Sequence, residues 1–243
     1  MKLTRIAMWS GPRNISTAML RSWENRADTV VVDEPLYGPY LFQTGKRHPM
    51  YQEIINEQGK HYQPITERLI TCEFPHDISI FYQKHMAHHI LEDTDLSWIV
   101  HLKNAILLRH PYEVLSSYLE KQPEATPEDI GYPQLLKLFK LIQSETGEIP
   151  PVFNSKDILI NPEMMLNKMC ESLEIPFNRE MLGWDKGYRE SDGVWAKHWY
   201  NSVILSTGFA KYKPKEIKLT RDEQKIADEC MPYYEELSKY KIL

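Results

Sequence analysis

The fold is decided by residues 4 to 26, which read TRIAMWSGPRNISTAMLRSWENR. The apolar run at 6–9 is typical of a buried strand. Gly11 and Pro12 end it, because proline lacks an amide hydrogen and keeps the preceding residue out of helix. Beyond this turn, apolar residues at helical spacing predict a helix that Ser16 or Thr17 would cap. We therefore expect a strand, a tight turn and a helix whose first backbone amides face the end of the strand.

Groups that bind anions gather at this turn. The Arg13 guanidinium, the Ser16 and Thr17 hydroxyls, the free amides and the positive end of the helix dipole together form the kind of site that holds phosphate. An ordinary capped helix with Arg13 in solvent is the alternative that this stretch alone leaves open. A Walker loop is excluded, because residues 11–17 lack the second glycine and the lysine of G-x-x-x-x-G-K-[ST].

Length and composition bound what the chain can be. Its 243 residues, 42% of them hydrophobic, can bury one sizeable core, and we expect a single α/β domain over 1–243. The net charge of −5 and the scattered basic residues give no nucleic-acid footprint. The three cysteines lack disulfide or zinc spacing, and no apolar stretch approaches about 18 residues. We expect a cytoplasmic protein without a membrane segment, and the oligomeric state stays open.

Strand-like and helix-like segments alternate along the chain. Further strands are predicted at 29–32, 78–83, 105–108 and within 150–159, and helices at 63–73, 112–121, 133–144, from 162 onward and at 221–240. This alternation predicts a doubly wound, mainly parallel sheet with helices on both faces, like that of P-loop nucleotide kinases. Ligands of such sheets bind at the carboxyl ends of the strands.

Two segments without strong periodicity are expected to cover the site. Residues 37–48 are rich in Tyr, Gly and Pro, and residues 184–212 interleave aromatic side chains with glycines. Long loops in compact domains are usually functional or disordered, and so many aromatic residues argue against disorder. We therefore expect substrate or lid segments at 37–75 and 184–212.

Two islands of sequence resemble the sulfotransferases that use 3'-phosphoadenosine 5'-phosphosulfate (PAPS). Residues 13–17, RNIST, are similar to that family's 5'-phosphosulfate loop in the basic residue and the two hydroxyls, although Asn14 and Ile15 replace the usual Ser-Gly. At the end of the strand at 105–108, Arg109 and Ser117 match the family's 3'-phosphate motif, with the proline of that motif also in place. The two islands are more specific together than either is alone.

A third island lies in the aromatic segment. Residues 193–200, GVWAKHWY, resemble the family's G-D-W-K-N-H-F-T segment at Gly193, Trp195 and His198. The family carries an Arg-Lys-Gly triplet just upstream, and only Arg189 lies near that position, one residue out of register.

The resemblance implies PAPS as the donor, adenosine 3',5'-bisphosphate as the product and no metal. It also implies a set of residues that contact the donor: Arg13, Asn14, Ile15, Ser16, Thr17, Arg109, Ser117 and Arg189. The acceptor is expected to be a small polar or aromatic molecule.

Two side chains at strand ends are candidates for the catalytic base. Sulfuryl transfer to a hydroxyl or amine needs a base for the acceptor proton and positive groups for the donor oxygens. Glu34 resembles the strand-end glutamate of bacterial and carbohydrate sulfotransferases, and His85 resembles the histidine of the Lys-x-His segment of the cytosolic branch. We favour Glu34, because the spacing at His85 is off by one, and we expect Lys84 to neutralise the phosphosulfate.

Two other functions use the same residues. In a P-loop kinase or nucleotide hydrolase, VVVDE at 30–34 would be a magnesium-holding strand, but phosphoryl transfer also relies on the loop lysine that is absent here. A module that binds a nucleotide without chemistry would keep Arg13, Arg109 and Ser117 and would have no use for Glu34 or His85. The sequence leaves O-sulfation and N-sulfation equally open.

Overall fold

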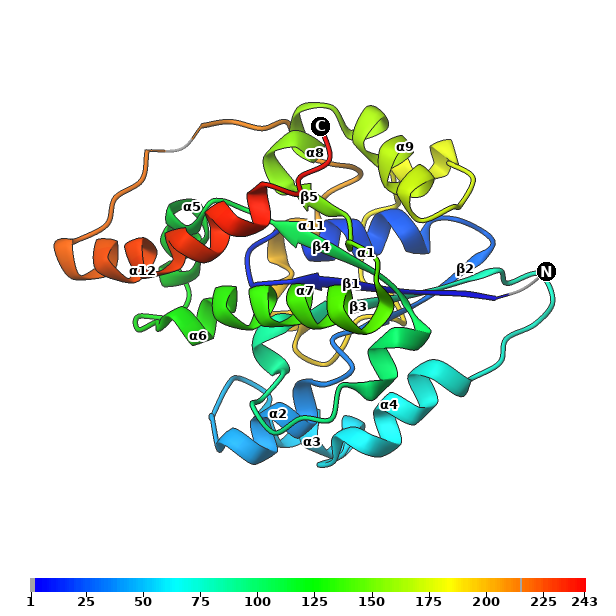
Figure 1. The fold of residues 1–243 in the computed structure, drawn as a ribbon, viewed down its shortest axis with the longest axis horizontal. Coiled ribbons are helices and arrows are strands. Elements are labelled where there is room, and N and C mark those ends of the chain that lie inside the picture. The colour runs from blue at the N-terminus through cyan, green and yellow to red at the C-terminus, as the bar shows by residue number, and fades with distance from the viewer. Residues whose placement is uncertain (1–2, 215) are drawn as a thin grey trace.

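A five-stranded parallel sheet forms the centre of the molecule (Figure 1). The computed structural model describes residues 3–214 and 216–243. The strands lie in the order β2-β3-β1-β4-β5, and every neighbouring pair is parallel, as the alternation of the sequence predicts. Their bounds are β1 (Thr4–Ser10), β2 (Thr29–Asp33), β3 (Ile80–Met86), β4 (Lys103–Leu108) and β5 (Val152–Asn154). The chain reverses its winding at β1, so the carboxyl edge beside β1 is where a ligand is expected.

Helices cover both faces of this sheet (Figure 1). The α-helices are α1 (Ser16–Glu24), α2 (Tyr37–Thr44), α3 (Tyr51–Gln58), α4 (Tyr62–Thr71), α5 (Pro111–Leu119), α6 (Pro127–Ile130), α7 (Tyr132–Thr146), α8 (Ser155–Ile160), α9 (Pro162–Ser172), α10 (Ala196–Trp199), α11 (Asn201–Ile204) and α12 (Arg221–Ser238). Three short 3₁₀ turns are η1 (Ala87–His89), η2 (Ser97–His101) and η3 (Arg179–Leu182). None of the helices in the described ranges is long and apolar enough to cross a membrane.

Successive side chains of β1 point to opposite faces and so build two hydrophobic cores. Ala7 and Trp9 belong to the core beneath α4, α7 and α12. Ile6 and Met8 belong to the core beneath α1 and α9. Because β1 is buried on both faces, it reads as an unbroken apolar run rather than an alternating one, which is why the strand was recognisable in the sequence.

A third, smaller core joins α2 and α3 to the aromatic segment at 193–204. The segments expected to lie over the site therefore pack on one another. The predicted loop at 37–48 is wrong over most of its length, because residues 37–44 form α2 in spite of Gly38 and Pro39. Pro39 falls in the first turn, where its missing amide hydrogen costs no hydrogen bond.

Three other expectations need correction. The strand expected within 150–159 is only β5, and the chain turns at once into α8. The third strand begins later and extends to Met86, so Lys84 lies inside β3. Neither Ser16 nor Thr17 caps α1, because the helix begins at Ser16 and the N-cap residue is Ile15, whose side chain cannot accept a hydrogen bond.

Glycine is required at position 11, just after β1, because the backbone of Ile130 lies very close to it. A Cβ atom added there would lie 2.4 Å from the carbonyl oxygen of Ile130. The short helix α6 therefore sits directly against the turn that leads into α1. Only glycine allows this contact without a shift of backbone.

We predict that Leu20→Ala destabilises the fold by about 2–5 kcal/mol, the usual cost of a cavity in a packed core. Leu20 is fully buried between α1 and the sheet. Leu205→Ala is the control, because Leu205 is 73% exposed and its loss is expected to change the free energy of unfolding by less than about 0.5 kcal/mol. Urea denaturation measures both, and equal effects would contradict the assignment of α1 to the core.

Candidate active site

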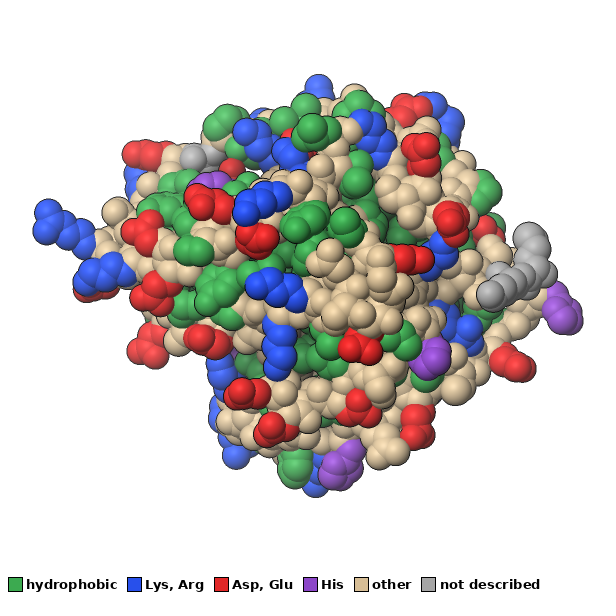
Figure 2. Space-filling view, in the orientation of Figure 1, with side chains coloured by type: hydrophobic (Ala, Val, Ile, Leu, Met, Phe, Trp, Pro, Cys, Tyr) green, Lys and Arg blue, Asp and Glu red, His purple; other side chains and the backbone are tan. Residues whose placement is uncertain are grey.

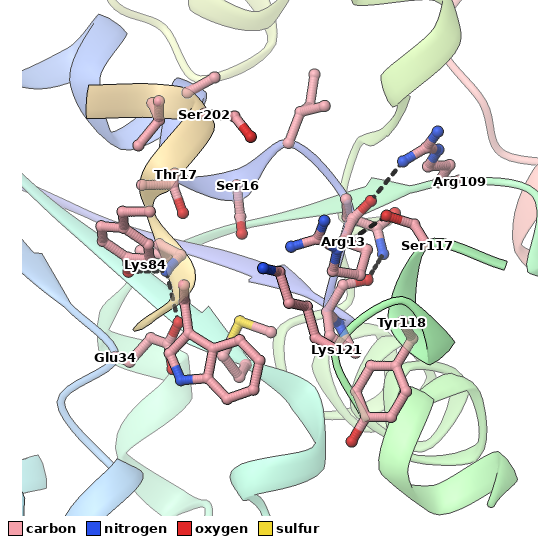
Figure 3. A pocket seen from close by; sticks show the side chains of 18 of the residues that line it. Arg13, Ser16, Thr17, Glu34, Lys84, Arg109, Ser117, Tyr118, Lys121 and Ser202 are labelled. Carbon is pink, nitrogen blue, oxygen red and sulfur yellow. Dashed lines mark hydrogen bonds and ion pairs between the residues drawn. The ribbon is translucent and has the colours of Figure 1, made fainter. Parts of the chain in front are cut away.

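A cavity of about 360 Å³ opens at the carboxyl ends of β1, β2, β3 and β4 (Figure 3). The turn after β1 forms its floor, β2 and β3 supply its polar end, and α5 and the segment at 199–210 close its sides. Its polar lining residues include Arg13, Ser16, Thr17, Glu34, Lys84, His88, His89, Arg109, Ser117, Lys121 and Ser202. Most of the residues predicted from the sequence therefore meet in one place.

The turn after β1 is held in a fixed loop by buried hydrogen bonds. The Asn14 amide donates to the carbonyl oxygens of Gly11 (3.2 Å) and Pro12 (3.0 Å). The backbone carbonyl oxygen of Asn14 in turn accepts a hydrogen bond from the Ser155 hydroxyl at 3.0 Å. Arg13 and Ile15 both adopt left-handed backbone angles, with φ of 60° and 58°. The loop thus keeps its tight curvature although Ile15 stands where the resemblance expects glycine.

Ser16 and Thr17 begin α1 with their hydroxyls unused as caps, and both line the cavity (Figure 3). The amides of the first helical turn have no intrahelical acceptor, and the helix dipole is positive at this end. The floor of the cavity is therefore the start of a helix after a strained loop, an arrangement that is suited to an anion.

Arg13 and Arg109 lie side by side, although they come from different strand ends (Figure 3). Arg109 donates from Nη1 to the carbonyl oxygen of Arg13 at 2.8 Å, and Arg13 donates from Nε to the Ser117 hydroxyl at 2.9 Å. Glu113 accepts from Arg109 Nε at 2.8 Å and fixes its orientation. Burial lowers the pKa of the Arg13 guanidinium, so an anion that neutralises it would be favoured.

Lys121 is a third cation at the end of the cavity that holds Arg13 and Arg109, and it was not predicted from the sequence. It lies just after α5 ends, four residues beyond Ser117, and its side chain extends into the cavity (Figure 3). Four residues is the spacing of neighbours on one helical face. That spacing from Ser117 was the one available indication of Lys121.

The polar end of the cavity is built around the buried ammonium of Lys84. Its Nζ donates to Asp33 Oδ1 (2.7 Å), Glu34 Oε1 (2.6 Å) and the Tyr200 hydroxyl (2.8 Å). Tyr200 donates in turn to the second oxygen of Asp33 and accepts from the Trp195 indole at 3.1 Å. Burial opposes the charge, but the two carboxylates raise the pKa of Lys84 well above its usual value. Lys84 is therefore a fixed cation already matched by protein oxygens.

Glu34 follows β2 with a left-handed backbone, φ 42°, which turns its side chain into the cavity. Burial raises the pKa of its carboxyl group, against the opposing effect of Lys84. Its Oε1 is taken by Lys84, whereas Oε2 faces the Nε2 atom of His89 at 3.9 Å. A carboxylate with one oxygen anchored and the other directed to the cavity can accept a proton from a bound molecule.

The structure does not bring His85 to the cavity. His85 lies on the opposite face of β3 from Lys84, stacks on Trp9 at 4.4 Å and approaches Gln83 Oε1 at 3.1 Å. Side chains alternate along a strand, so two adjacent residues cannot both face one site. The histidines that line the cavity are His48, His88 and His89.

The aromatic segment is only partly as expected. Trp195 is buried, and a Cβ atom on Gly193 would overlap its ring at 2.1 Å, so that glycine is required. Residues 196–204 form α10 and α11 rather than a loop. Arg189 lies away from the cavity lining, with its guanidinium donating to the Asp185 carbonyl at 3.2 Å. His198 is likewise absent from the lining.

Residues 4–240 match the family model described as a sulfotransferase domain. The chain belongs to this family. The resemblance drawn from the sequence islands is confirmed at that level.

No group of three or more His, Cys, Asp or Glu side chains that could hold a metal ion occurs within residues 3–214 and 216–243.

Two curated relatives of this sulfotransferase-domain chain come from Arabidopsis thaliana. They are the branched-chain-amino-acid aminotransferase-like proteins 1 and 2, which are 31% and 30% identical over 229 and 232 residues. Each match covers 94% of this chain and 40% of the relative, so the chain spans about two fifths of the length of these proteins.

Solved sulfotransferases share the fold. The sulfotransferase domain from the curacin biosynthetic pathway is 16% identical with a TM-score of 0.50, covering 95% of this chain and 99% of that one. A sulfotransferase from Alicyclobacillus acidocaldarius is 10% identical with a TM-score of 0.56, covering 100% and 98%. At these identities the similarity concerns the fold alone.

We predict that this sulfotransferase-domain chain loses stability on the acid side of neutrality. Burial lowers the pKa of His85 and His88 to about 3 and that of His89 well below its usual value. The unfolded chain binds these protons near pH 6.5 and the native state does not, so stability is complete above that pH and falls below it. Between about pH 7.5 and 5.5 each histidine should remove about 1.4 kcal/mol.

Glu34 acts in the opposite sense, because its raised pKa favours the native state at low pH, but three histidines outnumber one carboxyl group. Urea denaturation at both pH values measures the change. In His85→Asn, the free energy of unfolding should fall by about 1.4 kcal/mol less over this pH range, because one buried histidine is removed. A pH-independent free energy of unfolding would show that these rings are not buried in the neutral form.

Proposed function

We propose that the protein transfers a sulfuryl group from PAPS to a small-molecule acceptor. The observation that carries this proposal is the convergence of Arg13 and Arg109, from two separate strand ends, on one side of a cavity whose other side presents Glu34. A doubly phosphorylated adenosine carries anionic groups at two positions, and the two arginines with Ser117 and the start of α1 are suited to both.

The end of the cavity that holds Arg13, Lys121 and the start of α1 fits a phosphosulfate without assistance from a metal. Arg13, Lys121 and the first amides of α1 supply positive charge where negative charge would develop on the leaving phosphate. Lys84 does not fill the role we expected for it, because its three donor contacts go to Asp33, Glu34 and Tyr200. We therefore assign the neutralising role to Arg13 and Lys121.

The kinase alternative fits these contacts poorly. In that reading Asp33 would hold magnesium, but its two carboxylate oxygens already accept from Lys84 and Tyr200. The loop also offers no lysine to the phosphates. A binding module without chemistry would have no use for the free Oε2 of Glu34, so this carboxylate favours an enzyme.

The proposed reaction needs one proton transfer. The acceptor atom forms a bond to sulfur while the bond from sulfur to the bridging phosphate oxygen breaks, and that electron pair leaves with adenosine 3',5'-bisphosphate. The proton of the acceptor passes to Glu34 Oε2. The aromatic rings contributed by the segments 37–75 and 184–212, which include Tyr37 and Trp199, would hold the acceptor beside Glu34.

We predict that the protein binds adenosine 3',5'-bisphosphate and that Arg109→Ala weakens this binding roughly 10- to 100-fold. The loss of a charge-assisted fork to a phosphate is worth about 1.5–3 kcal/mol. Arg179→Ala is the matched control, because Arg179 is exposed and pairs with Glu163 on η3 and α9, outside the cavity lining. Calorimetric titration measures the affinities, and tighter binding of ATP with magnesium would favour the kinase instead.

We predict that Glu34→Gln lowers the rate of PAPS turnover roughly 10²- to 10⁴-fold and leaves the affinity for adenosine 3',5'-bisphosphate nearly unchanged. Glutamine keeps the shape and the Lys84 contact but cannot take a proton. His85→Asn serves as the comparison, since His85 faces the other core, and its turnover should stay near that of the parent. Equal turnover of the parent and Glu34→Gln would remove Glu34 as the base.

A further inference from the structure

A single heavy atom of the acceptor can contact both Glu34 and His89. The distance from Glu34 Oε2 to His89 Nε2 is 3.9 Å, which is too long for a direct hydrogen bond. It is short enough for one oxygen or nitrogen placed between them to lie at about 2.8 Å from each. Both residues line the cavity, and both side chains are held in place.

The orientation of each partner is fixed by separate contacts. Lys84 holds Glu34 Oε1 at 2.6 Å, which leaves Oε2 for the acceptor. The His89 ring is 1% exposed and packs against two tyrosines of α2, Tyr37 at 4.6 Å and Tyr40 at 4.8 Å between ring centroids, which restrain its orientation.

The surroundings of the two ring nitrogens place the proton of His89 on Nε2. The Nδ1 atom is buried and has no partner within the described part of the chain. A buried orphan N–H is rarer than a buried orphan acceptor, so Nδ1 carries the lone pair and Nε2 the hydrogen. Burial among charged and aromatic neighbours lowers the pKa of His89 and keeps the ring neutral, with one donor and one acceptor. His89 therefore presents a donor to the same point to which Glu34 presents an acceptor.

This arrangement distinguishes a hydroxyl from an amine. A hydroxyl oxygen has one hydrogen for Glu34 and two lone pairs, one to accept from His89 and one to attack sulfur. A neutral amine nitrogen has a single lone pair, which a hydrogen bond from His89 would occupy, so it could not attack. We infer that His89 sets the specificity of this site for hydroxyl acceptors over amines.

This inference rests on the proposed function and adds the acceptor class to it. The step is balanced as a sulfate ester synthesis: the acceptor oxygen bonds to sulfur, the bond from sulfur to phosphate breaks, and Glu34 receives the proton. His89 keeps its own proton throughout and acts by orienting the oxygen. An amine acceptor would give a sulfamate by the same balance, so the two products report directly on the selection.

The test uses ³⁵S-labelled PAPS and 4-aminophenol, which offers a hydroxyl and an unprotonated amine on one molecule at neutral pH. The parent protein should give the sulfate ester and no sulfamate, as identified by mass spectrometry. His89→Phe keeps a flat ring in contact with Tyr37 and Tyr40 but removes the donor. It should lower ester formation roughly 10- to 100-fold, with sulfamate as a larger share of the product and unchanged affinity for adenosine 3',5'-bisphosphate.

Two further variants separate orientation from folding. His89→Gln restores an N–H donor and should recover part of the lost rate and of the ester preference. His85→Phe changes a buried histidine that faces away from the cavity, and the parent product should persist. If 4-aminophenol is not a substrate, hydrolysis of PAPS by water replaces it as the readout. Release of labelled inorganic sulfate should then be roughly 10- to 100-fold slower in His89→Phe than in the parent.

Sulfamate as the main product of the parent would overturn the inference and leave the sulfotransferase activity standing. So would an unchanged rate and product ratio in His89→Phe. The absence of labelled product together with no binding of adenosine 3',5'-bisphosphate would instead refute the proposed function itself.

Discussion

The active-site architecture depends on the Lys84 ammonium, which is buried among Asp33, Glu34 and Tyr200. Removing Lys84 from this cluster would leave two buried carboxylates without their cation, which is strongly destabilising. Lys84 joins β3 to the end of β2, and Tyr200 brings the segment at 193–204 onto both strands. The same contact that closes the cavity therefore also aims the free oxygen of Glu34.

Backbone strain is concentrated at the same place. Of the non-glycine residues with left-handed angles in the described ranges, Arg13, Ile15 and Glu34 all line the cavity. For a β-branched residue such as Ile15 this conformation is particularly unfavourable. Strain of this kind persists only where surrounding contacts over-determine it, here the hydrogen bonds of Asn14 and Ser155 to the loop and to the end of β4. These contacts thus hold the loop in one shape, with its backbone amides and Arg13 at the cavity.

The sequence predicted the sheet and the arginine end of the cavity better than the end that holds Glu34 and His89. Strand and turn positions follow from local pattern, and Arg13 and Arg109 stand at strand ends where parallel topology brings them together. His85 was predicted wrongly as a site neighbour of Lys84, although strand alternation alone excludes both from facing one cavity. The place of His89 in the cavity could not be predicted from local pattern, because it depends on contacts of its ring with Tyr37 and Tyr40 of α2.

Charge is divided along this one cavity. Its unmatched cations lie at the arginine end, while the opposite end offers an anchored carboxylate and imidazoles that burial keeps neutral. A cation at the acceptor end would hold the acceptor proton away from Glu34, and a charged imidazolium would do the same. Under the proposed function, burial of the histidines and neutralisation of Lys84 leave Glu34 Oε2 as the basic atom that faces the acceptor. The packing of His89 against Tyr37 and Tyr40 contributes to that burial, and a buried ring that stays neutral can donate a hydrogen bond without giving up its proton.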